Sequence, residues 1–451
     1  MTLASSNTMD LTKGNVTGKM FRFALPLLMT YLLQHFYTIA DRVVVGRFAQ
    51  EGEAALAAIG ATSSAINMFM SLFLGLSVGA NILCANLRGA QKHKELSQAM
   101  HTAILLAAIC GTGIAVFGIL FAKPLLRFMG TPSDVLDKGA LYMSLYLAGA
   151  PVSLVYNFCA GILRAHGDTK RPMYILSLCG LVNVGLNLVF VIVFKRDVDG
   201  VAIATVISQL CSAIAALFIL FSPKGEYKLQ FSKLRIHKQY FSAILKTGIP
   251  CGLNSMVFSF SNVILQSSLN SFNSMVIIAG KTAAMDISTI IYQVIGAFYS
   301  ACVSFAGQCY GARVYKRIDQ LFIRSTLLVW GILIPLVTIC TIFPRPLLSL
   351  FNDNPEVVEA GIGVLLINSW GYLIYTVSEM ALGCLRGMRK STGPTVMNLL
   401  AICLPRIIWV ILFFPMNRTV EFLYLCYPIS WLISAVLQTL YYIHSRKKMK
   451  I

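Results

Sequence analysis

The chain has 451 residues, of which 57% are hydrophobic and only 12% are charged, and its mean hydropathy is +0.72. A soluble protein of this size cannot cover so much apolar surface, so the composition predicts an all-α, polytopic membrane protein. The formal charge of +19 could suggest nucleic acid as a partner, but the basic residues lie in short loops between apolar segments, which membrane topology explains better. The 12 cysteines form no C-x-x-C pair and the six histidines lack metal-ligand spacing, so we expect no cofactor, metal or disulfide framework.

Twelve apolar segments follow one another along the chain, and each is long enough to span a bilayer as a helix. Lys and Arg gather at the amino terminus, in the even-numbered loops and at the carboxyl terminus, which predicts that both termini lie in the cytoplasm of a bacterial inner or plasma membrane. The segments cover residues 20–41, 55–86, 97–121, 138–163, 172–194, 198–221, 241–270, 277–308, 320–343, 358–384, 394–414 and 421–443.

The first span carries a polar stripe that ends in a carboxylate. Its four polar residues recur at i, i+4, i+7 and i+11, so they share one face of a helix. An ionised Asp at mid-membrane depth costs about 3 kcal/mol on insertion scales, so this face must meet an aqueous cavity or other helices. The stripe is a predicted cation and substrate site, and its residues are Thr30, Gln34, Tyr37 and Asp41.

Two further features of this span bear on its role. Pro26 lies one turn before Thr30 and removes a backbone donor, so the helix can bend there as a hinge. A structural interpretation of Asp41 stays open, because a neighbouring cation, Arg42 or Arg47, could hold a carboxylate at the helix end.

The fifth and sixth spans add neutral polar groups. Asn183 and Asn187 stand at i, i+4 in an apolar helix, and two buried amides need partners. Thr205 and Gln209 share a face near the start of the next span. The amides could bind a cation beside Asp41, or they could join helices without any further role.

The second half contains a comparable stripe without a charge. Ser255, Ser259, Asn262 and Gln266 repeat the spacing of the first stripe and predict a second, polar cavity wall. Two carboxylates also lie within its apolar segments. Glu379 and Asp286 are both candidates for the substrate cavity, although Asp286 lies near the start of the eighth span, where an anion suits the helix dipole.

The two halves are repeats. Gly89-Ala90, Pro124, Arg164 and Pro172 each recur 222 positions later, as Gly311-Ala312, Pro346, Arg386 and Pro394. Six spans in each repeat give both the same orientation, so the lobes should be related by a pseudo-twofold axis along the membrane normal. The predicted parts are an amino-terminal cytoplasmic tail at 1–18, lobes at 19–221 and 241–444, a cytoplasmic linker at 222–240 and a basic tail at 445–451.

Several motifs together resemble the multidrug and toxic compound extrusion (MATE) family. They are YTIADRVVVGR in the first span, GILRAHGDTKRP after the fourth, DGVAIAT at the sixth and GCLRGMRKSTGP after the tenth. The resemblance implies twelve helices in two lobes, and export of cationic, amphipathic compounds in exchange for protons or sodium ions. It also implies a coupling site in the amino-terminal lobe at Gln34, Tyr37, Asp41, Asn183, Asn187 and Thr205.

Some relatives carry Asp where this chain has Asn187, so the site here keeps a single carboxylate. This leaves two possibilities, one-proton coupling or a sodium ion held by Asp41 with neutral oxygens. The expected mechanism is that the ion neutralises Asp41, changes its hydrogen bonds to Tyr37, Asn183 and Asn187, and rearranges the helix near Pro26.

Other functions fit the sequence less well. A lipid-linked oligosaccharide flippase of the same superfamily would need a cavity rich in cations, whereas Arg406 is the main cation within a span. A membrane-embedded enzyme would need clustered acidic or His residues at a membrane face, and the sequence shows none. A channel would not explain two repeats with one buried carboxylate. We therefore expect a transporter, working as a monomer, rather than an enzyme.

Overall fold

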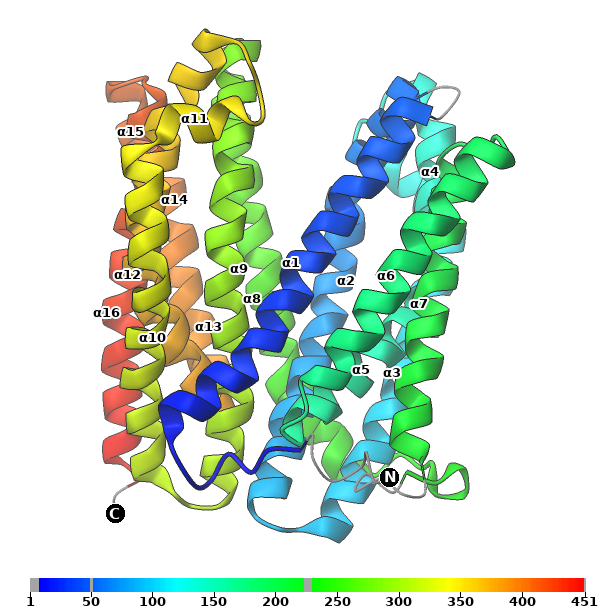
Figure 1. Ribbon diagram of the computed structural model, residues 1–451, viewed down its shortest axis with the longest axis vertical. Helices are drawn as coiled ribbons and strands as arrows, with labels where there is room; N and C mark the ends of the chain where they lie inside the picture. Colours follow the sequence, from blue (N-terminus) through cyan, green and yellow to red (C-terminus); the bar gives the residue numbers. More distant parts are fainter. Residues whose placement is uncertain (1–7, 49–51, 223–228, 450–451) are drawn as a thin grey trace. The chain divides into compact units, whose positions relative to one another are not determined.

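The computed structural model describes residues 8–48, 52–222 and 229–449 (Figure 1). Within these ranges the chain is helical, with short connections and no strands. Parts of three predicted segments, the tails at 1–18 and 445–451 and the linker at 222–240, lie outside the described residues. In the linker, Ser222 and the residues from Leu229 onwards are described.

The described chain forms two compact units. The first contains Met1–Asp10 and Met29–Gly252, and the second contains Leu11–Leu28 and Leu253–Ile451. Two helices therefore contribute to both units. The division falls two residues after Pro26 in the first of these helices and two residues after Pro250 in the other.

The helices of the first unit are long and apolar, as expected for membrane spans. The helices α3, α4 and α5 pack against one another, and α2 packs on α5. The helices are α1 (Val16–Phe48), α2 (Gly52–Gly89), α3 (His93–Phe128), α4 (Ser133–Ala148), α5 (Ala150–Ala165), α6 (Lys170–Leu188), the π-helical η1 (Val189–Val193) and α7 (Val198–Phe221).

The second unit is built around the contact between two long helices, α9 and α12, with α16 and α10 packed on α12. Its penultimate span is irregular, since it alternates between α-helical and π-helical segments. The elements are η2 (Phe231–Lys233, before this unit), α8 (Lys238–Asn270), α9 (Met275–Gly311), α10 (Tyr315–Ile342), α11 (Pro344–Ser349), α12 (Pro355–Gly387), α13 (Thr392–Asn398), η3 (Leu399–Cys403), α14 (Leu404–Ile408), η4 (Trp409–Phe413), η5 (Phe414–Met416), α15 (Val420–Tyr424) and α16 (Cys426–Lys447).

Among the described residues, eleven helices are long and apolar enough to cross a membrane, and a bent pair gives a twelfth. The pair consists of Val135–Ala148 and Ala150–Ala165, which meet at an angle of 44°. The sequence predicted one uninterrupted segment at 138–163. The bend occurs at Gly149, where an added Cβ would lie 2.6 Å from Val206 Cγ2, so α7 packs closely against the break.

The sequence repeat is also visible in the backbone. Gln91 and Arg313, which are 222 positions apart, both adopt left-handed conformations with φ of 57° and 61°. Gly167 and Arg389 are related in the same way, with φ of 84° and 62°. A positive φ is uncommon for residues other than glycine, so its recurrence at the same offset shows that the two halves turn in the same way.

Linker residues just before α8 pack onto α3. The backbone N–H of Gln230 donates to His101 Nε2 at 3.0 Å, and the backbone N–H of His237 donates to Thr102 Oγ1 at 3.2 Å. These bonds attach the start of α8 to the first unit, which agrees with the assignment of the chain through Gly252 to that unit.

Within the first unit, α2 and α8 meet through glycines spaced four residues apart. A Cβ added at Gly79 would lie 2.6 Å from the Ile244 carbonyl oxygen, and one added at Gly248 would lie 2.7 Å from Leu76 Cα. Gly75 and Gly252 face each other so closely that an added Cβ would overlap backbone atoms. Small residues at this spacing let helix backbones approach closely in a membrane, where apolar burial contributes little to association.

Replacement of Gly79 with Leu should therefore destabilise the protein, because the side chain cannot enter the α2–α8 contact without separating the helices. We expect a loss of about 1–3 kcal/mol, the usual range for overpacking. The thermal midpoint of the purified protein, followed by size-exclusion chromatography, measures the effect. The control is Gly113→Leu on α3, where no atom lies within 4 Å of an added Cβ. Equal stability of the two variants would contradict the close packing.

Candidate functional site

A pocket in the first unit is lined mainly by polar side chains from α1, α6 and α7. It contains most of the predicted coupling residues and has one carboxylate, Asp41. The lining residues are Gln34, Tyr37, Thr38, Asp41, Leu176, Cys179, Gly180, Asn183, Thr205, Ser208, Gln209 and Ser212.

Asp41 is joined to α6 and α7 by a chain of amide hydrogen bonds. Asn187 Nδ2 donates to Asp41 Oδ1 at 2.5 Å and lies 3.4 Å from Asn183 Oδ1. Asn183 Nδ2 in turn donates to Thr205 Oγ1 at 3.5 Å. The hydroxyl of Thr205 also donates to the Val201 carbonyl at 2.9 Å, so the chain ends on backbone. The structure therefore brings four predicted coupling residues together.

The carbonyl oxygen of Asn187 is available for a further interaction. The side chain is fully buried, its Nδ2 is used by Asp41, and its Oδ1 has no hydrogen-bond partner. A buried polar atom without a partner is costly, so such an atom commonly marks a position that water, a proton donor or a cation can occupy. Carboxylate and amide oxygens are the ligands that hard cations prefer.

In the described residues Asp41 has no arginine partner. The carboxylate is largely buried and accepts a hydrogen bond from Asn187, and neither Arg42 nor Arg47 forms an ion pair with it. The interpretation of Asp41 as a carboxylate held by a neighbouring cation is therefore not supported by the geometry.

Tyr37 is fixed by α6 rather than by Asp41. Its hydroxyl donates to the carbonyl of Ser177 at 2.9 Å, and its ring lies directly over Gly180, where an added Cβ would overlap it. The expected hydrogen bond from Tyr37 to Asp41 is thus replaced by one to the backbone of α6. The glycine is the reason that the ring can reach the pocket.

Two other predicted residues of α1 lie outside this pocket lining. Thr30 is buried, with 8% of its surface exposed. Pro26 lies inside an uninterrupted helix, because α1 runs from Val16 to Phe48 without a break. The proline therefore leaves the helix continuous, although the division between the two units follows it closely.

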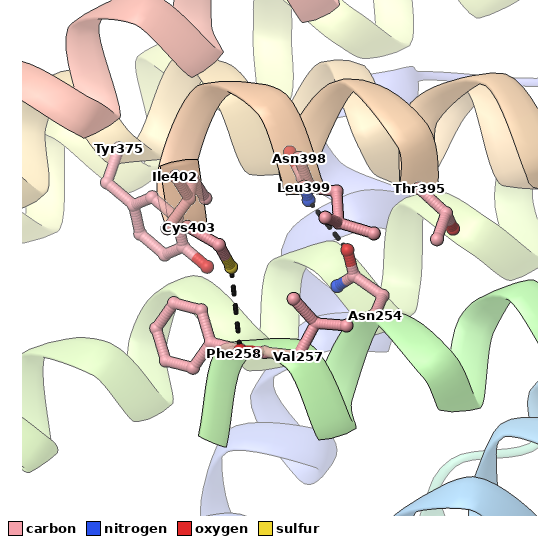
Figure 2. Close-up of a pocket in the computed structure, with 9 residues that line it drawn as sticks. All are labelled: Asn254, Val257, Phe258, Tyr375, Thr395, Asn398, Leu399, Ile402 and Cys403. Carbon is pink, nitrogen blue, oxygen red and sulfur yellow. Dashed lines mark hydrogen bonds between the residues drawn. The ribbon is translucent and has the colours of Figure 1, made fainter. Parts of the chain in front are cut away.

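The second unit has a smaller pocket between α8 and the irregular span (Figure 2). Figure 2 shows Asn254 and Phe258 on α8 facing Asn398 and Cys403, with the Tyr375 ring at one end. Asn398 Nδ2 donates to Asn254 Oδ1 at 3.1 Å. The remaining lining residues are Val257, Thr395, Leu399 and Ile402.

The four predicted stripe residues on α8 do not line this pocket together. Ser255 and Ser259 are exposed and do not line the pocket, because the residues that face it are Asn254 and Phe258. Asn262 Oδ1 accepts hydrogen bonds from Arg406 and Tyr427. Gln266 Oε1 accepts from Lys281 Nζ at 2.7 Å.

The dipole interpretation of Asp286 is wrong. Helix α9 begins at Met275 and has no acidic residue in its first turn, whereas the effect of the dipole is confined to that turn. Asp286 lies three turns into the helix and interacts with Lys281. Glu379 is buried, with 8% of its surface exposed, and its carboxylate contacts Tyr375 and interacts with Arg386.

A MatE family model matches residues 26–189 and, a second time, residues 250–412. The chain belongs to the MatE family. The two matches begin 224 positions apart, at Pro26 and Pro250, and together they cover most of the chain, so the repeat and the resemblance seen in the motifs are both confirmed.

Two of the relatives that the chain resembles are named as multidrug proteins. The probable multidrug resistance protein YoeA of Bacillus subtilis (strain 168) is 28% identical over 414 residues, which are 88% of this chain and 86% of the relative. The multidrug export protein MepA of Staphylococcus aureus (strain MSSA476) is 22% identical, and the match covers 87% of each chain.

A solved MATE transporter of the MOP superfamily, in an outward-facing conformation, has the same fold. It matches with a TM-score of 0.90 over 100% of each chain at 21% identity. The predicted fold class, an all-α polytopic membrane protein with two lobes, is confirmed.

Sequence reasoning missed several polar residues at the pocket of the first unit. Ser208 and Ser212 follow Thr205 on α7 and line the pocket, and Tyr146 of α4 hydrogen-bonds to Gln209 and interacts with Asp41. Single hydroxyls in apolar helices give a weak signal, because they usually bond their own backbone, as Ser208 and Ser212 also do. The π-helical η1, which begins two residues after Asn187, has no sequence signal that we recognise.

The packing of Tyr37 on Gly180 can be tested directly. Gly180→Leu should displace the Tyr37 ring from the pocket and lower drug export at least several-fold, because the added side chain occupies the same space. Export of a fluorescent cation from cells measures the effect. Gly185→Leu, on the same helix with no atom within 4 Å of an added Cβ, should leave export unchanged. Normal export by the Gly180 variant would show that the ring position does not matter.

Proposed function

We propose that the protein is a secondary antiporter that exports cationic, amphipathic compounds in exchange for protons or sodium ions by alternating access. It works as a monomer in a bacterial inner or plasma membrane, with both termini in the cytoplasm. The observation that carries the proposal is the single carboxylate of the polar pocket, Asp41, which is bound by the buried amide of Asn187 and has no permanent cationic partner among the described residues.

A carboxylate in this setting can hold either a small cation or a positively charged compound. Burial weakens its hydration, so neutralisation by a proton or sodium ion is favourable, and the free Oδ1 of Asn187 lies beside it to complete the ion's ligands. A cationic drug also gains from the negative charge. Since the two ligands require the same charge, binding of one disfavours the other, and this competition is sufficient for antiport.

Neutralisation of Asp41 would act on the helices through the amide chain. Once the carboxylate is neutral, the hydrogen bond from Asn187 weakens, and α1 is no longer held to α6 at that point. Pro26 lowers the resistance of α1 to bending, because its backbone lacks a donor. We propose that the part of α1 after Pro26 moves in response, which narrows the pocket and releases the drug.

The names of the relatives support a drug as the exported compound, since YoeA and MepA are both described as multidrug proteins. The alternative, a lipid-linked oligosaccharide flippase, needs several cations to bind pyrophosphate. The residues that line the pocket of the first unit include no Lys or Arg, which favours the drug exporter.

Asp41→Asn should abolish active export while leaving expression and membrane insertion near normal, because the amide keeps the size of the carboxylate but cannot change charge. Ethidium efflux from cells should fall to the level of cells without the protein. The control is Asp353→Asn, an exposed acid in the loop before α12, which should export normally.

The same variants, reconstituted in proteoliposomes with proton and sodium gradients applied separately, show which ion drives transport. The gradient of the coupling ion should drive uptake of the compound by the wild-type protein. Neither gradient should drive uptake by the Asp41→Asn variant. Full drug resistance in cells that express the Asp41 variant would remove this residue from the mechanism.

A further inference from the structure

An arginine lies buried within the penultimate span of the second unit. Arg406 belongs to α14, in the apolar stretch Thr392–Met416, and only 1% of its surface is exposed. Its Nε donates to Ser430 Oγ and its Nη1 donates to Asn262 Oδ1, each at 3.2 Å. The guanidinium also stacks over the ring of Tyr427, 4.1 Å from the ring centroid.

The charge of Arg406 has no partner of opposite sign in the described part of the chain. The ion pairs of this unit join Arg345 to Glu359 and Arg446 to Asp319. Glu379, the buried carboxylate of α12, interacts with Tyr375 and Arg386 instead.

One guanidinium nitrogen, Nη2, is buried and makes no hydrogen bond. The oxygens around Arg406 are neutral, so they satisfy only some of its donors and none of its charge.

A second buried donor without an acceptor lies close by. Trp431 on α16 is 2% exposed, and its Nε1 has no hydrogen-bond partner. Its ring packs edge-on against Tyr427 with the centroids 5.4 Å apart, and Arg406 stacks on the face of the same tyrosine. Arg406 and Trp431 thus border one aromatic ring, and Nη2 of the first and Nε1 of the second find no acceptor among the described residues.

The two donors are connected to the pocket of Figure 2 by residues that line it. The Cζ atom of Arg406 lies 5.3 Å from the ring centroid of Phe258. The ring centroids of Trp431 and Tyr375 lie 5.2 Å apart. Both Phe258 and Tyr375 line the pocket, and Cys403 is less than one turn before Arg406 (Figure 2). Neither donor lines the pocket itself, so the rings of Phe258 and Tyr375 must move aside for an occupant to reach them.

A buried charge without a counter-ion is among the most costly features that a membrane protein can contain. An anionic group would supply the acceptor and the counter-charge that Arg406 lacks, and an acceptor for the indole N–H of Trp431. The rings of Tyr372, Tyr375, Tyr427 and Trp431 pack on one another beside it and would stack on a flat apolar body.

We infer that the second unit contains a binding site for an aromatic carboxylate, with Arg406 and Trp431 as the donors to its carboxylate group. If the proposed function also holds, the protein would accept aromatic compounds with a carboxylate group in addition to cationic compounds. This part of the inference rests on that function, whereas the binding site itself does not.

The test uses two ligands of nearly the same shape and opposite charge, 2-naphthoate and 2-naphthylmethylammonium. Their binding to the full-length protein in nanodiscs is measured by isothermal titration calorimetry. Arg406→Gln should weaken binding of naphthoate at least ten-fold and leave binding of the ammonium compound unchanged. The matched control is Arg345→Gln, which removes an exposed, ion-paired arginine of the same unit and should bind both ligands normally.

A buried arginine can also be needed for folding, so a second variant is required. Trp431→Phe keeps the aromatic packing and removes only the N–H, and it should weaken naphthoate binding several-fold while the ammonium compound binds as before. Equal naphthoate affinity in the wild type and both variants would overturn the inference, as would failure of the wild type to bind naphthoate.

Asp41→Asn separates this inference from the proposed function. It should weaken binding of the ammonium compound and spare naphthoate. Normal binding of the ammonium compound by this variant would count against the proposed function and leave the carboxylate site supported.

Discussion

A carboxylate inside an apolar helix must find a polar partner, and most of the first unit's chemistry follows from the way Asp41 does so. Its partner is an amide, Asn187, and no cation among the described residues neutralises it. An arginine in that position would have fixed the charge permanently. An amide stabilises the anion but allows a proton or another cation to replace it, and the amide's own oxygen remains free. The site is therefore stable in more than one charge state.

The two halves share their backbone and differ in their chemistry. The left-handed turns at Gln91 and Arg313 and the two MatE matches show that the same fold was used twice. The buried charge of the first pocket is negative and lies among amides and hydroxyls, whereas a positive charge, Arg406, lies near the second pocket among tyrosines and a tryptophan. A duplicated scaffold can thus keep its packing while its two interiors become suited to groups of opposite sign.

The parts of this structure that sequence could predict depend on local periodicity. The stripe containing Gln34, Tyr37 and Asp41 and the amides Asn183 and Asn187 lie together because a helix fixes which side chains share a face. What depended on tertiary packing was missed. The rotation of α8 about its own axis decides that Asn254, rather than Ser255, lines a pocket. Helix α9 begins at Met275, so Asp286 lies too far from the helix start for the dipole to act on it. The position of the Tyr37 ring depends on Gly180 in another helix, and the spacing of residues within one helix cannot reveal such a contact.

The division of α1 and α8 between the units has a consequence for how the molecule could be taken apart. Leu11–Leu28 belongs with the carboxyl-terminal helices, and the start of α8, through Gly252, belongs with the amino-terminal ones. Each unit thus includes a segment that comes from the other half of the polypeptide. Cleavage in the linker at 222–240 would give two fragments. Each fragment would lack one segment of its own unit and would carry one segment of the other unit. Such halves should be poorly folded alone and should associate when made together, like the protomers of a segment-exchanged dimer.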